Sequence, residues 1–292
     1  MTIALLVHGG AGDIAPEHIA EAQSGCSTAV KIGWQILESG GSALDAVEAT
    51  VRALEDNPSF NAGTGACLAL DGNIELDAGI MDGRSLRVGA LAGLELVKNP
   101  ISVARKILES PHALLIGKGA QQFALEQGIT LCRYEELLTE RQHQKWLEAR
   151  EKLNQNTPKH GTVGAVAVDS TGALAAATST GGILNKYPGR VGDSPLVGCG
   201  FYADDYAAVS CTGYGEDFIR LMIARRAAEF VSAGASAQEA ADATIAVLSA
   251  KAEGDGGLIV VDREGRVGVA HNSPQMAYGY LRSDLREPIA GV

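Results

Sequence analysis

Pairs of apolar, strand-like segments separated by short turn sequences are the feature that most limits how this chain can fold. Such pairs occupy 66–70 with 74–81, 162–168 with 173–178, and 258–261 with 267–270. The intervening sequences are rich in Asp and Gly, which is typical of β-hairpins. Because helical patterns occur between the pairs, the sequence predicts an α+β fold with largely antiparallel sheets and helices packed outside them.

Further elements follow from apolar periodicity and capping residues. Ser42 and Asp45 form a capping-box pattern that begins a helix ending near Glu55. A buried strand at 3–7 is expected to run into a glycine-rich turn at 8–12. The other predicted helices span 16–39, 101–108, a segment after Gly119, 216–231 and 237–250, and the other predicted strands span 86–94, 112–116, 197–203 and 207–211.

Composition restricts the partners and the compartment of the protein. The formal charge is −11, from 24 basic and 35 acidic residues, and the basic residues are scattered, so nucleic acid and anionic membranes are not expected partners. The five cysteines have no metal-binding spacing and are interpreted as buried apolar residues of a reducing compartment. The apolar run at 3–7 is too short for a signal sequence or a membrane span, which predicts a cytoplasmic protein.

The tripeptide His160-Gly161-Thr162 marks a boundary in the chain. The most polar stretch, 133–159, ends in a linker-like segment at 154–159, and a strand of small residues begins at Thr162. A threonine becomes a strong nucleophile if the chain is cut just before it. The freed α-amine, whose ordinary pKa is about 7.7–8.0, can then deprotonate the hydroxyl of the same residue.

Several common catalytic motifs are excluded. The run at 8–12, HGGAG, resembles an α/β-hydrolase oxyanion loop, but no serine lies in a G-x-S-x-G elbow, so His8 is interpreted as a hydrogen-bonded structural residue. None of the G-x-G segments continues to a dinucleotide-binding motif, and there is no Walker pattern. The chain lacks HExxH and its six histidines are dispersed, so a zinc site is not expected.

A group of polar residues downstream of Thr162 could serve such a nucleophile. Thr180 ends the strand that pairs with the Thr162 strand. Arg190 and Asp193 lie three residues apart in a loop rich in Gly and Pro, where they could bind an amino-acid zwitterion or form a salt bridge with each other. Spacing alone favours neither reading. The segment Thr212-Gly213-Tyr214-Gly215 follows a strand and precedes a helix, where it could stabilise an oxyanion or only cap the helix.

Taken together, these segments resemble the plant-type asparaginase or isoaspartyl peptidase family of N-terminal nucleophile hydrolases over nearly the whole chain. The matching runs are HGGAG at 8–12, LEDNPSFNAGTG at 54–65, ELDAGIMDG at 75–83, HGTVGAVAVD at 160–169, TSTGGILNKYPGRVGDSPLVG at 178–198, SCTGYGE at 210–216 and GDGGLIVVD at 254–262. The resemblance implies a single domain, residues 1–292, folded as a four-layer αββα sandwich. It also implies self-cleavage between Gly161 and Thr162 into an α subunit, 1–161, and a β subunit, 162–292.

The resemblance also implies an activity and roles for individual residues. The expected reaction is hydrolysis of β-aspartyl dipeptides and L-asparagine through an acyl-enzyme on Thr162, with release of L-aspartate and no catalytic cofactor. Expected functional residues are Thr162 as nucleophile, Thr180 beside it, Arg190 and Asp193 as substrate clamp, Thr212 and Gly213 as oxyanion site, Gly215 in the substrate-facing loop, and Asn61 near the active site.

Three further expectations rest on the same resemblance. Backbone carbonyls of Leu54, Glu55, Phe60 and Ala62 would bind a structural sodium ion, since hard oxygen ligands suit it. The protein would form a dimer of αβ units. The segment 271–276 departs from the family pattern, with Ser273 in place of Thr, and could shape the pocket. The alternatives are glycosylasparaginase activity and, more remotely, an amino-acid-binding protein that keeps the fold without processing.

Overall fold

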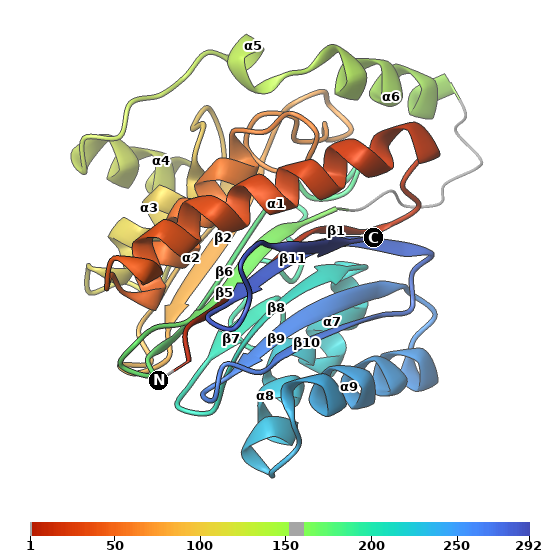
Figure 1. Ribbon diagram of the computed structural model, residues 1–292. Coiled ribbons are helices and arrows are strands. Elements are labelled where there is room, and N and C mark those ends of the chain that lie inside the picture. The colour runs from red at the N-terminus through yellow and green to blue at the C-terminus, as the bar shows by residue number, and fades with distance from the viewer. Residues whose placement is uncertain (1, 152–160) are drawn as a thin grey trace.

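Two sheets lie face to face in the computed structural model, and helices cover their outer faces (Figure 1). The structure describes residues 2–151 and 161–292. The first sheet has the strand order β12-β11-β1-β5-β6-β2-β3-β4, and the second has the order β10-β9-β8-β7. All neighbouring strands of these sheets pair antiparallel except β3 with β4, so the predicted α+β class with largely antiparallel sheets is confirmed.

The elements of the described chain have the following bounds. The strands are β1 (Ala4–Gly12), β2 (Leu76–Asp82), β3 (Val88–Leu94), β4 (Leu114–Ile116), β5 (Val163–Val168), β6 (Leu174–Thr180), β7 (Phe201–Ala203), β8 (Ala207–Gly213), β9 (Gly256–Asp262), β10 (Val267–His271), β11 (Gln275–Arg282) and β12 (Ile289–Gly291). The helices are α1 (Pro16–Glu38), α2 (Ala43–Glu55), α3 (Pro100–Leu108), α4 (Gly117–Glu126), α5 (Tyr134–Leu137), α6 (Glu140–Glu151), α7 (Gly215–Leu221), α8 (Ile223–Ser232) and α9 (Ala237–Lys251). None of the described helices is both long and apolar enough to cross a membrane.

The core is divided into layers by the two sheets. Helices α1, α2 and α3 pack on the outer face of the first sheet, whereas α8 and α9 pack on the outer face of the second (Figure 1). Between the sheets lie side chains such as Leu6, Val166, Phe201 and Ile259. Small residues permit this close packing, since a Cβ added at Gly79 would lie 2.2 Å from the Phe201 ring.

Strand β5 is central, because it lies between β1 and β6 in the first sheet. The predicted hairpin of β5 and β6 is confirmed, with Val163 opposite Ser179 at its open end. Every residue of both strands is buried. A residue that directly precedes β5 is therefore placed at the centre of the sheet edge by strands on both sides.

Two predictions in the N-terminal half were wrong. The glycine-rich segment 8–12 is not a turn, because β1 continues to Gly12 with a register shift between His8 and Gly10. Positive φ angles at Gly10 and Gly12 permit this irregular strand. The segment 66–70 is not a strand, although the expected turn at 71–73 forms. Its backbone bonds instead to loop groups, with Leu70 N donating to Lys186 O.

The second half of the chain differs from expectation in three places. The single helix predicted at 216–231 is two helices, because Met222 adopts φ 52° between α7 and α8. The first turn of α8 donates instead to the 198–199 loop, from Ala224 N to Cys199 O and from Arg225 N to Gly198 O. Only the last three residues of the strand expected at 197–203 form a strand, which is β7. Strands β11 and β12, which were not predicted, extend the first sheet beside β1.

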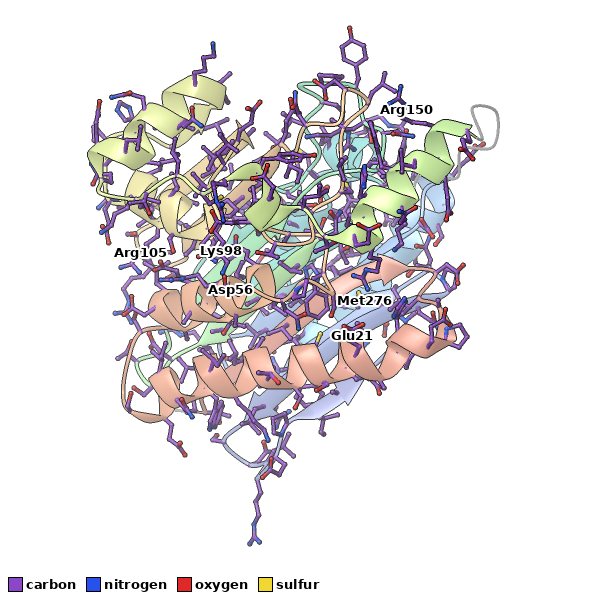
Figure 2. The ribbon with its side chains drawn as sticks, turned by 90° about the horizontal axis from the view of Figure 1, so that it is seen from above. Glu21, Asp56, Lys98, Arg105, Arg150 and Met276 are labelled. Atoms are coloured by element: carbon purple, nitrogen blue, oxygen red, sulfur yellow. The ribbon has the colours of Figure 1, made fainter. Side chains whose placement is uncertain are left out.

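The end of α2 contains a buried carboxyl group. Glu55 has no solvent exposure, its Oε1 accepts from Ile101 N at 3.0 Å, and burial raises the pKa of its carboxyl to about 8. The next residue, Asp56, lies 3.4 Å from Lys98 at the surface, and Figure 2 shows these two side chains together. Glu55 therefore joins α2 to the first turn of α3 as a largely neutral acid near pH 7.

We expect Glu55→Gln to change how stability depends on pH. The unfolded chain releases the Glu55 proton near pH 4.5, whereas the folded chain holds it up to about pH 8. The parent therefore loses stability as pH rises from 4.5 to about 8. Glutamine does not titrate. The free energy of unfolding of the Glu55→Gln variant, relative to that of the parent, should therefore grow with rising pH by at most about 1.4 kcal/mol per pH unit. Urea unfolding at pH 5 and pH 8, in a Thr162→Ala background that keeps one covalent chain, measures this.

The control is Glu38→Gln, which removes an exposed carboxylate at the end of α1. A stability difference between Glu55→Gln and its parent that stays constant from pH 5 to pH 8 would contradict a neutral Glu55.

Candidate active site

Gly161 and Thr162 directly precede β5, and both line a pocket. Thr162 is 5% exposed, although it adjoins a polar segment of the sequence. His160 and the linker expected at 154–159 lie outside the described residues. The predicted nucleophile is thus placed next to Gly161 at the start of the central strand.

The carbonyl group of Gly161 accepts two hydrogen bonds. Thr180 Oγ1 donates to it at 2.7 Å and Asn61 Nδ2 at 2.8 Å. Thr180 is the donor in its bond to Gly161, since Gly161 O can only accept, and Thr180 Oγ1 in turn accepts from Gly182 N at 3.0 Å. Two donors on one carbonyl withdraw electron density from its carbon and make that carbon more electrophilic.

Asn61 is held in place through its own amide group and backbone. Its Nδ2 also donates to Gly182 O at 2.7 Å, and its Oδ1 accepts from Cys67 N at 2.8 Å. Its backbone oxygen accepts from Gly181 N at 3.0 Å. The irregular segment that begins near Cys67 therefore helps to orient Asn61.

The pocket brings most of the predicted site residues together. Thr162 and Thr180 line it together with Arg190, Asp193 and Gly213. The other lining residues are Gly161, Gly182, Ile183, Gly192 and Ser194. Asn61 reaches the site through its bond to the Gly161 carbonyl. Gly215 lies against the clamp loop, since a Cβ there would be 2.9 Å from Arg190 and 3.0 Å from Asp193 N.

Arg190 and Asp193 are not joined by a salt bridge in the part of the chain that the structure describes. Arg190 instead makes two hydrogen bonds to Glu216, from Nε at 2.9 Å and from an Nη at 2.7 Å. Asp193 is 3% exposed, and burial raises the pKa of its carboxyl to about 7 against the opposing charge of Arg190. Because its Oδ2 lacks a hydrogen-bond partner among described residues, Asp193 is available to a cationic group.

Thr212 and Gly213 end β8 beside the pocket. Thr212 is fully buried, and its Oγ1 accepts from Ala11 N at 3.1 Å. A hydroxyl that accepts this bond still has its own proton to donate. Gly213 lines the pocket directly, whereas Thr212 does not.

Sequence reasoning missed three residues that support the site. Glu216 holds Arg190, and Lys186 donates to Arg190 O at 3.1 Å while it lies 3.0 Å from Glu75. Ser194 Oγ lies 3.4 Å from Thr162 Oγ1. All three residues occur in sequence runs that carry the family resemblance, but their spacing alone gives no sign of these contacts.

His8 is buried and hydrogen-bonded, as the sequence predicted. It has no solvent exposure, its Nε2 lies 2.8 Å from Ser210 Oγ, and burial lowers its pKa to about 3. The imidazole is therefore neutral at neutral pH.

In the loop expected to bind sodium, two backbone carbonyl oxygens each lie close to a glycine. A Cβ at Gly65 would lie 2.9 Å from Phe60 O, and one at Gly63 would lie 2.7 Å from Glu55 O. Backbone carbonyl oxygens are hard ligands, the type of donor that suits such an ion. Glu55 O also accepts from Thr64 N at 2.9 Å. Within the described residues, no group of three or more His, Cys, Asp or Glu side chains could hold a metal.

None of the residues 271–276 is among the described residues that line the pocket. Asn272 Oδ1 accepts from Gly256 N at 2.9 Å, and Gln275 Oε1 accepts from Ile14 N at 2.9 Å. Met276 is buried opposite Ala11. The segment therefore fixes the end of β1, which carries the Ala11 N–H that bonds Thr212.

Comparison with known proteins identifies the family of the chain. The asparaginase family profile matches residues 1–289. A plant-type L-asparaginase of Pyrococcus horikoshii is 45% identical over 309 aligned positions, which cover 99% of this chain and 100% of the relative. An isoaspartyl peptidase/L-asparaginase of Bos taurus is 44% identical over 287 positions, which cover 95% of this chain and 92% of the relative. The chain therefore belongs to the asparaginase family.

Proposed function

We propose that this protein is a self-cleaving amidohydrolase that releases L-aspartate from β-aspartyl dipeptides and from L-asparagine. Its relatives carry the names L-asparaginase and isoaspartyl peptidase/L-asparaginase. The observation that carries the proposal is the Gly161–Thr162 peptide bond, whose carbonyl accepts from Thr180 and Asn61. The two groups suited to an amino-acid zwitterion, Arg190 and Asp193, line the same pocket.

In the first reaction the Thr162 hydroxyl attacks the carbonyl carbon of Gly161. The C–N bond breaks, an ester forms on Oγ1, and the hydroxyl proton passes to the departing nitrogen, which becomes the α-amine of Thr162. Thr180 and Asn61 stabilise the negative charge that develops on the Gly161 oxygen. Water then hydrolyses the ester, so that 1–161 ends in a carboxylate and 162–292 begins with a free threonine.

In the second reaction the new α-amine serves as the base for the same hydroxyl. Thr162 attacks the side-chain carbonyl of the substrate, ammonia or an amino acid leaves, and water hydrolyses the acyl-enzyme. Thr212 and Gly213 are proposed to stabilise the oxyanion. This role is supported by the proton that Thr212 retains while its oxygen accepts from Ala11 N.

The clamp would bind the two charges of the substrate separately. Arg190 is proposed to bind the α-carboxylate, and Asp193 the α-ammonium. An arriving ammonium would lower the pKa of Asp193 and favour its charged form. Glu216 already occupies Arg190 through two bonds, so a substrate carboxylate must share the guanidinium or displace Glu216.

We further propose that the layers seen here are the αββα sandwich of an N-terminal nucleophile hydrolase, a single domain that assembles as a dimer of αβ units. A structural sodium ion held by carbonyls of Leu54, Glu55, Phe60 and Ala62 would stabilise the loop that carries Asn61. The five free cysteines, four of them buried, are consistent with a cytoplasmic location.

Glycosylasparaginase activity is the alternative within the same chemistry. Assay of a glycosylated asparagine against a β-aspartyl dipeptide distinguishes the two activities. A non-processing amino-acid-binding protein is the remote alternative, and the cleavage experiment that follows excludes or supports it.

We expect the purified chain to separate on a denaturing gel into two fragments, the smaller beginning at Thr162 by N-terminal sequencing. Thr162→Ala should remain a single chain without activity, because it has no hydroxyl to attack Gly161. The matched control is Thr171→Ala, which removes the hydroxyl of an exposed threonine in the turn at the opposite end of the β5–β6 hairpin. That hydroxyl bonds Asp169 and Arg84, away from the pocket, so the variant should be cleaved normally. A persistently full-length parent would contradict self-cleavage.

We expect Arg190→Ala to be cleaved at the parent rate but to bind substrate poorly, because the described structure shows no bond from Arg190 to Thr162 or to the Gly161 carbonyl. KM for a β-aspartyl dipeptide should rise at least about tenfold, which corresponds to about 1.4 kcal/mol. Arg190→Lys, which keeps the charge but not the paired donors, should have a KM between those of the parent and Arg190→Ala. Hydrolysis by Arg190→Ala with the parent KM would contradict the clamp.

We expect Thr212→Val to lower both stability and kcat. The methyl group that replaces the hydroxyl cannot accept from Ala11 N, and leaving that buried N–H without a partner costs about 1–3 kcal/mol. The change also removes the donor proposed for the oxyanion, whereas Thr212→Ser keeps the hydroxyl and should retain both properties. Thermal unfolding and steady-state kinetics measure the two effects. Loss of stability with an unchanged kcat would contradict the proposed role of Thr212 in stabilising the oxyanion.

A further inference from the structure

Ser194 is the residue whose side chain meets the hydroxyl of Thr162. Its Oγ lies 3.4 Å from Thr162 Oγ1, and either oxygen can be the donor. Ser194 is 1% exposed and lines the pocket. Neither the reaction steps proposed for Thr162 nor the substrate clamp gives this hydroxyl a role.

The turn that carries Ser194 is fixed on several sides. Thr178 Oγ1 donates to Ser194 O at 2.7 Å, which ties the turn to β6 beside the nucleophile. Leu196 N donates to Asp193 O at 2.8 Å and closes the turn. The backbone of Gly200 packs so closely that a Cβ there would lie 2.7 Å from Ser194 Cα. Ser194 therefore presents its hydroxyl from a rigid position.

A threonine hydroxyl needs such a partner because its side chain can adopt more than one χ1 rotamer. Only a rotamer that directs a lone pair of Oγ1 at the carbon under attack is productive, and small misplacements of reacting atoms slow reactions strongly. If Ser194 donates its proton to Thr162 Oγ1, one lone pair of Oγ1 is fixed by that bond and another is free to attack, while the Thr162 proton stays available to the departing nitrogen or to the new α-amine.

We propose that the Ser194 hydroxyl donates a hydrogen bond to Thr162 Oγ1 and holds it in the attacking rotamer, both in self-cleavage and in substrate hydrolysis. Ser194 orients the nucleophile and takes no proton from it. Because Asp193 is the preceding residue, one rigid turn then positions the nucleophile and the site for the substrate ammonium together. This inference rests on the proposed function.

The test compares Ser194→Ala with the parent protein in three measurements. These are the first-order rate of self-cleavage, kcat and KM of the fully processed enzyme on a β-aspartyl dipeptide, and the thermal unfolding midpoint. We expect self-cleavage and kcat each to fall about tenfold, the size expected for one hydrogen bond to a reacting group, with KM and the midpoint nearly unchanged. Ser194→Thr, which keeps a hydroxyl, should restore most of both rates.

The matched control is Ser179→Ala, which removes a fully buried hydroxyl of β6 that lies near the Glu55 carboxyl and is absent from the described lining of the pocket. It should leave both rates unchanged. Parent-like rates in Ser194→Ala would overturn the role of Ser194, and so would a rise in KM with unchanged kcat, because that pattern indicates a displaced clamp. A parent protein that neither cleaves nor hydrolyses would overturn the proposed function itself, so the two failures are distinguishable.

Discussion

The hydrogen bonds from Thr180 and Asn61 to the Gly161 carbonyl are the interactions on which the site depends. They hold the chain that enters β5 against β6 on one side and against an irregular loop on the other. The fold supports them by placing β5 between β1 and β6, with every residue of β5 buried. Because neighbouring strands restrain β5 on both sides, the peptide bond before it has little freedom to move away from its two donors.

Buried charge in the pocket supports the proposed binding of an amino acid. Arg190 is neutralised by Glu216, and Lys186 by Glu75. Asp193 instead has a buried oxygen without a hydrogen-bond partner among the described residues, and burial raises its pKa to about 7. An unpaired buried carboxyl is costly in its charged form, so it gains from an incoming cation. The pocket is therefore electrostatically incomplete at the point where a substrate ammonium is proposed to bind.

Local sequence signals identified most elements correctly, and the errors have definite physical causes. Helices α1, α2, α3 and α9 follow their predicted ranges closely, because capping residues and apolar periodicity are local properties. The segment 66–70 was mistaken for a strand because its apolar residues pack in a small separate cluster while its backbone bonds to distant loops. Likewise α7 and α8 separate at Met222 because the loop at 198–199 supplies acceptors that sequence periodicity does not reveal.

By itself, the sequence determined the α+β class, the hairpin that begins after Thr162 and, through its motifs, the residues expected in the pocket. Only the tertiary structure decided how those residues are paired. It joined Arg190 to Glu216 rather than to Asp193, and it placed Ser194 against the Thr162 hydroxyl. The physical reason is that motif residues can be recognised one at a time, whereas a hydrogen-bond partner depends on which strands and loops the fold brings within about 3 Å of each other.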